Sequence, residues 1–201
     1  MTITIVSGFG RCGSSMIMQM LEGGGMPMSG QFPAFENEYG AGLFSGTLTA
    51  DMMRKIDGCA VKLLDPHRGV IPKGPQYRAI WCVRDPGEQA KSQAKFLRLL
   101  SGIQMSRAEI RGFVRSYEKD KAPAMQSLDR AGVPRDGIIA LRFQSVLANP
   151  WEAAEKINAH CGGGLNTEKM AAAVIQRSPA CAPGLDLEMG LIEQREERTR
   201  P

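Results

Sequence analysis

The chain has 201 residues, of which 43% are apolar and 23% charged, and its formal net charge is +4. These totals are typical of one globular domain with a single large core, and the small charge excess argues against a nucleic-acid partner. No apolar run approaches the roughly 20 residues of a membrane span, and residues 1–7 lack the basic region and cleavage site of a secretory signal.

We therefore expect a cytoplasmic protein without an integral membrane segment. The five cysteines are scattered, and no two of them form a C-x-x-C pair. This pattern indicates reduced thiols and argues against a structural zinc site.

The first third of the chain predicts a strand, a helix and an irregular segment. Residues 2–6 are rich in β-branched side chains, and residues 14–23 form a helical pattern that ends in three glycines. Residues 26–48 have no clear period and contain four of the twelve aromatic residues. A short helix is expected around residues 50–57, ending at Gly58.

The middle of the chain predicts two strands and two capped helices. Strands are expected at residues 59–64 and 77–83, and the second is apolar enough to be central. The run Asp85-Pro86-Gly87-Glu88 is a strong helix start, with an aspartate N-cap and a proline at the first helical position. Ser106 and Glu109 form the capping box of the next helix.

The last third predicts a break, a strand and another helix. Pro123 is expected to break or kink the preceding helix, which stops at Gly132. Residues 138–143 form the next strand, and Asn149-Pro150 begins a helix that ends at Gly162. The tail, residues 193–201, is polar and expected to be solvated.

This alternation of strands and helices predicts an α/β fold with three α/β/α layers around a mainly parallel sheet, of the P-loop nucleotide-hydrolase-like class. We expect residues 1–201 to form one domain. In such sheets the ligand lies beyond the carboxyl ends of the strands. Polar residues follow or end three of the predicted strands: Arg11, Lys62, Asp65 and Arg84.

The segment IVSGFGRCGSS has the glycine spacing of the nucleotide-binding pattern G-x-x-x-x-G-K-[ST], but Ser14 stands where that pattern has its lysine. A glycine-rich turn that opens a helix offers backbone N–H groups and the positive helix end to an anion. Ser14 and Ser15 add hydroxyl donors and Arg11 adds a cation. The alternative is an ordinary strand–helix turn in which glycines serve geometry only.

Two other cations are candidates for the same ligand. Arg84 follows a buried strand and Ser92 comes eight residues later, so the two could clamp a second phosphate. Alternatively, Arg84 pairs with Asp85 and Ser92 is a surface serine. Lys62 lies within an apolar strand, where burial is costly without an anionic partner; the alternative is that its chain reaches the surface.

Together these motifs resemble those of the sulfotransferases that use 3′-phosphoadenosine-5′-phosphosulfate (PAPS). The chain looks like a small bacterial or phage-type member of that family. Residues 11–15 match that family's [KR]-x-G-[ST]-[ST] loop for the 5′-phosphosulfate. Arg84 and Ser92, with the intervening Asp85-Pro86, match its 3′-phosphate motif, and Lys62 matches its strand lysine. The later strand places Phe143 where the family often has an aromatic residue near the adenine.

The resemblance implies a metal-free transfer of a sulfuryl group from PAPS to an acceptor hydroxyl or amine, which leaves 3′-phosphoadenosine-5′-phosphate (PAP). Arg11 and Lys62 would stabilise the transferring group. The implied nucleotide-binding residues are Arg11, Cys12, Gly13, Ser14, Ser15, Arg84, Ser92 and Phe143.

The chain departs from the family pattern in three ways. Leu64 stands where one branch has its catalytic histidine, no C-terminal R-K-G motif for the 3′-phosphate is evident, and the chain is short. Whether Arg177 substitutes for the R-K-G motif stays open. Other branches use a glutamate some twenty to thirty residues after the loop. Glu36 is the preferred base on this ground, with Glu38 in reserve and His67 as a further alternative. Solvated loop carboxylates are an equal alternative for both glutamates.

The acceptor stays open among small molecules, glycans, lipids and peptides, and so does the oligomeric state. Residues 26–57, with their aromatic side chains, are expected to form an acceptor wall or lid, or else ordinary loop packing. Arg107, Arg111 and Arg115 line one helix face, more typical of a solvated face than of an anion site. The rival functions are a P-loop kinase or nucleotide phosphotransferase and a non-catalytic nucleotide-binding module.

Overall fold

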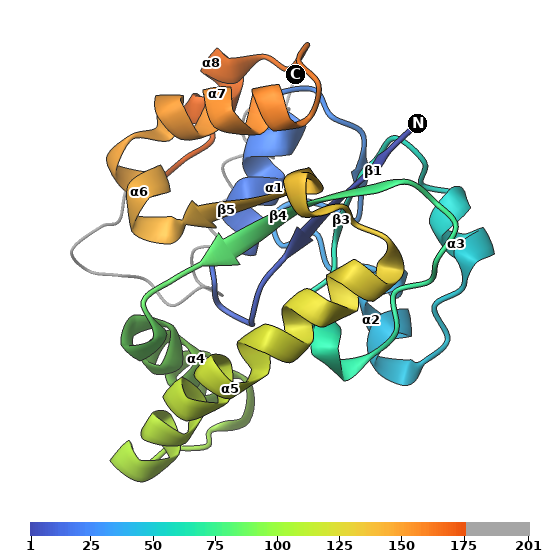
Figure 1. Ribbon diagram of the computed structural model, residues 1–201. Coiled ribbons are helices and arrows are strands. Elements are labelled where there is room, and N and C mark those ends of the chain that lie inside the picture. Colours follow the sequence, from blue (N-terminus) through green and yellow to red (C-terminus); the bar gives the residue numbers. More distant parts are fainter. Residues whose placement is uncertain (176–201) are drawn as a thin grey trace, which may run out of the picture.

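A five-stranded parallel sheet forms the centre of the computed structural model, which describes residues 1–175 (Figure 1). Its strand order is β2-β3-β1-β4-β5, and every neighbouring pair is parallel. The strands are β1 (Ile3–Ser7), β2 (Met28–Ser29), β3 (Ala60–Lys62), β4 (Tyr77–Val83) and β5 (Ile138–Arg142). The predicted parallel α/β architecture is confirmed.

Helices cover both faces of the sheet, which gives the predicted three layers (Figure 1). One layer contains α1 (Ser14–Gly23), α6 (Phe143–Ala148), α7 (Pro150–His160) and α8 (Thr167–Ala172). The other contains α2 (Glu38–Ser45), α3 (Ala50–Arg54) and α5 (Arg107–Ala131), and α4 (Pro86–Ser101) packs beside α5. Short 3-10 helices occupy Pro66–Arg68 and Arg135–Gly137.

The strands divide their side chains between two hydrophobic cores. In β1, Ile3 and Ile5 face the core that α2, α3 and α5 complete, whereas Val6 faces the core of α1, α7 and α8. In β4, Trp81 and Cys82 divide in the same way. This period of two is that of an extended strand buried on both faces, and it explains why apolar side chains occupy consecutive positions in both strands, such as Ile5 and Val6 in β1.

The capping signals in the sequence begin the helices where they were expected. Asp85 accepts a hydrogen bond from the Glu88 backbone, with Pro86 at the first helical position. Ser106 and Glu109 form the complete capping box. The Asn149 side chain caps α7 in the same manner.

The structure differs from three expectations about elements. Of the break or kink expected at Pro123, the break does not occur, because α5 continues through this residue to Ala131. Phe143 begins α6 instead of ending the strand, which stops at Arg142. The irregular stretch at 26–48 contains β2 and α2, whose lengths of two and eight residues are too short to show a clear period.

Candidate active site

The glycine-rich loop between β1 and α1 adopts a conformation that its glycines require. Gly8 and Gly13 have positive φ angles of 149° and 99°. A Cβ atom at Gly8 would lie 2.8 Å from the Cys82 carbonyl oxygen, and one at Gly13 would lie 2.5 Å from the Phe143 ring. Because glycine has no side chain, the loop can approach β4 and α6 closely at these two positions.

The loop is held in place by hydrogen bonds from α4 and from the segment after β3. The Gln89 side-chain amide donates hydrogen bonds to the carbonyl oxygens of Phe9 (3.1 Å) and Gly10 (2.8 Å). The Asp65 backbone N–H donates to the Gly8 carbonyl oxygen at 2.9 Å. Three loop carbonyls are thereby engaged on the protein side, and Ser14, the buried first residue of α1, hydrogen-bonds the Cys12 thiol.

Phe9 anchors the loop in the hydrophobic core. Its ring is stacked on Tyr117 with the centroids 5.5 Å apart, and it meets the rings of Trp81 and His67 edge-on at 5.6 and 5.7 Å. The loop is therefore fixed to both β4 and α5 through one side chain.

The first group of site residues, which we call the arginine end, consists of Arg11, Arg84, Ser92, Phe96 and Phe143. Arg11 Nε donates to Ser92 Oγ at 3.4 Å, and Arg84 Nη1 donates to the Arg11 carbonyl oxygen at 3.1 Å. Each guanidinium lies over an aromatic ring, Arg11 over Phe96 at 4.8 Å and Arg84 over Phe143 at 4.5 Å. Such stacking fixes the plane of the guanidinium while keeping its N–H groups at the ring edge.

Glu88 forms an ion pair with Arg84, with 3.7 Å between Arg84 Nε and Glu88 Oε2. It also accepts a hydrogen bond from Gln144 at 3.1 Å. Two guanidinium groups and one carboxylate leave the arginine end with an excess of positive charge, which favours an anionic ligand.

The second group, the lysine end, consists of Ser15, Ala34, Glu36 and Lys62. Lys62 Nζ donates to Glu36 Oε1 at 2.6 Å, to the Ala34 carbonyl oxygen at 2.7 Å and to Ser15 Oγ at 3.2 Å. The Lys62 side chain is only 4% exposed, whereas that of Glu36 is 72% exposed. The anionic partner that a buried strand lysine requires is therefore Glu36.

Glu36 is brought to Lys62 by the packing of its neighbours. Phe35 is fully buried with φ at 57°, so the chain turns sharply beside Glu36. The Asn37 side chain donates to the Ser29 and Phe35 carbonyl oxygens and accepts from the Gly40 backbone. Gln19 of α1 donates to the Pro33 carbonyl oxygen at 2.9 Å. This segment therefore packs directly against α1 and β3.

The other base candidates lie in different surroundings. Glu38 is the exposed first residue of α2. His67 lies against Phe9, and its Nε2 atom is 3.6 Å from Asp120 Oδ2. Of the three predicted bases, Glu36 is thus the one in contact with a predicted site cation, Lys62. Arg177 and the 193–201 tail lie outside the described residues.

Two thiols, that of Cys12 in the loop and that of Cys82 in β4, lie on the protein side of the loop. Cys12 and Cys82 are both buried, and the described cysteines, including these two, are free. A hydrogen bond from the Cys82 thiol lowers the pKa of Cys12, whereas the same contact and burial raise the pKa of Cys82 well above its ordinary value. Cys12, predicted as a nucleotide contact, therefore has its side chain turned into the protein, and only its backbone belongs to the loop surface.

Gln89 and Phe96 are site residues that the sequence reasoning missed. Both follow from helical spacing, because residues three before and four after Ser92 lie on the same helix face. If Ser92 faces the loop, as predicted, then Gln89 and Phe96 must face it too.

No protein-family model matches the chain, and the search of curated proteins found no match either. Solved structures do match. A mouse sulfotransferase complexed with PAP aligns with a TM-score of 0.55 and 14% identity, over 86% of this chain and 62% of that one. A sulfotransferase from Alicyclobacillus acidocaldarius aligns with a TM-score of 0.54 and 14% identity, over 89% and 87% of the two chains.

The sulfotransferase domain of the Synechococcus PCC 7002 olefin synthase aligns with a TM-score of 0.50 and 15% identity, over 92% of this chain and 82% of that one. The chain spans less than two thirds of the mouse protein, 62% of its length. None of the helices described here is long and apolar enough to span a bilayer. At these identities the comparisons establish the fold alone: this chain has the P-loop-like α/β fold of the sulfotransferases.

Proposed function

We propose that the protein transfers a sulfuryl group from PAPS to an acceptor hydroxyl or amine. The observation that carries this proposal is that one glycine-rich loop contacts cations at two places, Arg84 through the Arg11 carbonyl oxygen at the arginine end and Lys62 through Ser15 at the lysine end. PAPS has a matching distribution of charge, with a 3′-phosphate at one position and a 5′-phosphosulfate at another. The similar mouse sulfotransferase was crystallised with PAP, which supports the same nucleotide here.

Arg84 and Ser92 of the arginine end would bind the 3′-phosphate, whereas Arg11, the arginine of the loop, would help Lys62 to stabilise the transferring group. Arg84 is the arginine of the predicted 3′-phosphate motif, Arg84-Asp85-Pro86, and its contact with the Arg11 carbonyl oxygen ties the end of β4 to the loop. Phe143, held on Arg84 and against Gly13, offers an apolar face on which an adenine could stack. The 5′-phosphosulfate would then lie along the N-terminus of α1, where Ser14 and Ser15 begin the helix.

The lysine end would carry out the chemistry. The acceptor oxygen attacks sulfur in line with the bridging oxygen of the phosphosulfate, the S–O bond to the phosphate breaks, and PAP leaves with that electron pair. Glu36 takes the acceptor proton. Lys62 and the loop N–H groups stabilise the charge that develops on the sulfuryl and leaving oxygens.

Donor binding would also release the base. Lys62 has three N–H donors, and all three are engaged with Ser15, Ala34 and Glu36. A sulfuryl oxygen can reach Lys62 only by replacing one of them. Glu36 is the partner that can leave most easily, because its side chain is mostly in solvent. The carboxylate then becomes free to face the acceptor after the donor has bound.

A thermal-shift experiment tests the nucleotide assignment. Stabilisation by PAP without Mg²⁺ supports it, since a ligand that binds only the folded state raises the unfolding temperature. Stabilisation by ATP and Mg²⁺, with no response to PAP, would indicate the kinase alternative and overturn the proposal.

Turnover separates an enzyme from a binding module. We expect Glu36→Gln to lower the rate of sulfuryl transfer by roughly 10²–10⁴-fold, the usual contribution of a general base, while its affinity for PAP is retained. Glu38→Gln is the matched control, because it removes a carboxylate two residues away and should leave the rate unchanged. Equal rates in wild type and Glu36→Gln would remove Glu36 as the base, and PAP binding without turnover over a wide panel of acceptors would favour the module.

A further inference from the structure

The helical hairpin formed by α4 and the first half of α5 projects from the body of the protein (Figure 1). The buried residues of α5 are Ala124, Ser127, Leu128 and Ala131, all in its second half. The first half is tied to the core by stacked rings, since Tyr117 lies on Phe9 and the Phe113 ring is 6.3 Å from that of Tyr117. The α4 helix is tied to the glycine-rich loop through Gln89, Ser92 and Phe96.

The hairpin carries a charge excess as large as that of the whole chain. Residues 87–116 contain six basic and two acidic residues, an excess of four, which Glu118 and Lys119 at the end of this half of α5 leave unchanged; the formal net charge of the chain is also +4. All six basic side chains are exposed. They recur at helical spacing on each helix: Lys91, Lys95 and Arg98 on α4, and Arg107, Arg111 and Arg115 on α5.

Within residues 1–175, these six cations have no carboxylate partner. The two acidic residues of the hairpin have other partners, because Glu109 belongs to the capping box and Glu88 lies beside Arg84 and Gln144. The positive charge of the hairpin is therefore directed to solvent.

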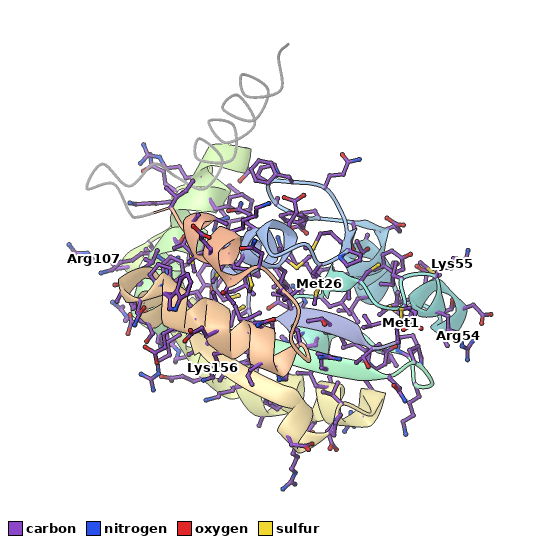
Figure 2. The ribbon with its side chains drawn as sticks, turned by 90° about the horizontal axis from the view of Figure 1, so that it is seen from above. Met1, Met26, Arg54, Lys55, Arg107 and Lys156 are labelled. Carbon is purple, nitrogen blue, oxygen red and sulfur yellow. The ribbon has the colours of Figure 1, made fainter. Side chains whose placement is uncertain are left out.

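The turn of the hairpin adds apolar surface to this charge. Ile103 is 56% exposed, and Met105 is half-buried beside it. Arg98 and Arg107 flank this turn on the two helices. In the view of Figure 2, Arg107 lies at the opposite end of the molecule from Met1, Arg54 and Lys55.

We propose that the α4–α5 hairpin binds the surface of a membrane that contains anionic phospholipids. Basic side chains around an exposed apolar residue fit the boundary between headgroups and acyl chains, where the cations meet phosphates and the apolar side chain enters the hydrocarbon. A soluble polyanion such as nucleic acid would satisfy the cations but would leave Ile103 in water. A second copy of the chain carries the same positive hairpin, so like charges would repel. The proposal does not depend on the nucleotide assignment.

Vesicle sedimentation with the full chain tests it. We expect binding to vesicles that contain phosphatidylglycerol and little binding to pure phosphatidylcholine vesicles. Each basic residue near an anionic surface contributes roughly a fivefold factor, so Arg107→Gln, Arg111→Gln and Arg115→Gln together should weaken binding roughly 100-fold. Ile103→Ser should weaken it roughly tenfold through the lost apolar contact.

The matched control replaces Lys55, Lys73 and Lys169 with glutamine, which removes the same charge from exposed positions outside the hairpin. This control should bind anionic vesicles nearly as well as the wild type. Equal losses in the control and the arginine variant would overturn the proposal. So would equal binding of the wild type to neutral and anionic vesicles.

A polyanion site is distinguished by a third outcome. Tight binding to heparin or a DNA duplex, together with vesicle binding that Ile103→Ser does not weaken, would assign the hairpin to polyanions and reject the membrane. The thermal unfolding of all variants should match the wild type, because every replaced side chain is exposed. The thermal shift with PAP should also persist in them, so a failed membrane test and a failed nucleotide test remain separate results.

Discussion

The lysine end and the arginine end of the candidate site hold positive charge in different ways. At the lysine end a single ammonium group, 4% exposed, is 2.6 Å from a carboxylate. At the arginine end two guanidinium groups stack on aromatic rings, and the Glu88 carboxylate is 3.7 Å from Arg84. The first arrangement is nearly neutral and can be rearranged by a ligand, whereas the second is a fixed excess of charge.

This difference suggests a division of labour. A rigid, charged site suits a phosphate that stays bound throughout a reaction, because planar guanidinium groups bind such anions in a fixed orientation. A paired lysine and carboxylate suit a group that changes during the reaction, because charge and protons can move there. Binding would then depend on the arginine end and rate on the lysine end.

The largest expected effect comes from a substitution at the lysine end. We expect Lys62→Met to lower the rate of sulfuryl transfer by roughly 10²–10³-fold at saturating PAPS, as for the loss of another transition-state donor. Single-turnover transfer from PAPS measures this rate, with the exposed Lys55→Met as control and circular dichroism as the check on folding. A change confined to donor affinity would mean that both ends serve binding only.

The next largest effect comes from a substitution at the arginine end. Arg84→Ala should weaken the binding of PAP by roughly 10–100-fold, the usual worth of a hydrogen bond to a charged group. Calorimetric titration with PAP measures it, and Arg135→Ala removes an exposed arginine as control. The proposed division fails if Arg84→Ala instead keeps its affinity and loses its rate at saturating PAPS.

A smaller effect concerns the loop that both ends share. Gln89 is 3% exposed and donates to two loop carbonyl oxygens. Gln89→Met leaves both carbonyls without this donor, so the free energy of unfolding should fall by about 1–3 kcal/mol. Urea denaturation measures it, with the exposed Gln104→Met as control. Unchanged stability would show that water replaces the amide at no cost.

The smallest effect concerns Asp65, whose backbone contacts the loop. Burial raises the pKa of Asp65 above its ordinary value of 3.8. The folded state therefore holds this proton more tightly than the unfolded state does, and ionisation of Asp65 lowers stability as the pH rises through its folded pKa. Asp65→Asn removes that cost. Asparagine also tolerates the left-handed backbone found there, where φ is 48°.

The gain of Asp65→Asn over the wild type should be largest near neutral pH and should disappear below the ordinary carboxyl pKa. Thermal unfolding at several pH values measures it, with the exposed Asp136→Asn as control. A variant that is less stable than the wild type at neutral pH would show that the carboxylate has a favourable partner.

Much of the fold could be predicted because its signals are local. Asp85-Pro86, Ser106 with Glu109, and Asn149-Pro150 each fix a helix start within one turn, and all three predictions are confirmed. Strand β4 has the predicted bounds because its apolar run is continuous. The expected break at Pro123 does not occur, because helical residues on both sides and the packing of Ala124 and Leu128 in the core maintain one helix.

The sequence by itself determined where the cations lie along the chain and that the parallel strands bring them to one edge of the sheet. It also specified the loop, because Gly8 and Gly13 are needed for positive φ angles and close contacts. Such features depend on residue type and on spacing within a few positions.

Only the tertiary structure decided which side chains meet. Lys62 pairs with Glu36 across 26 positions, and Arg11 reaches Ser92 across 81. Both contacts depend on how the segment after β2 folds back over α1 and on how α4 leaves β4. These are properties of packing between distant segments, and sequence spacing alone does not fix the direction of a side chain.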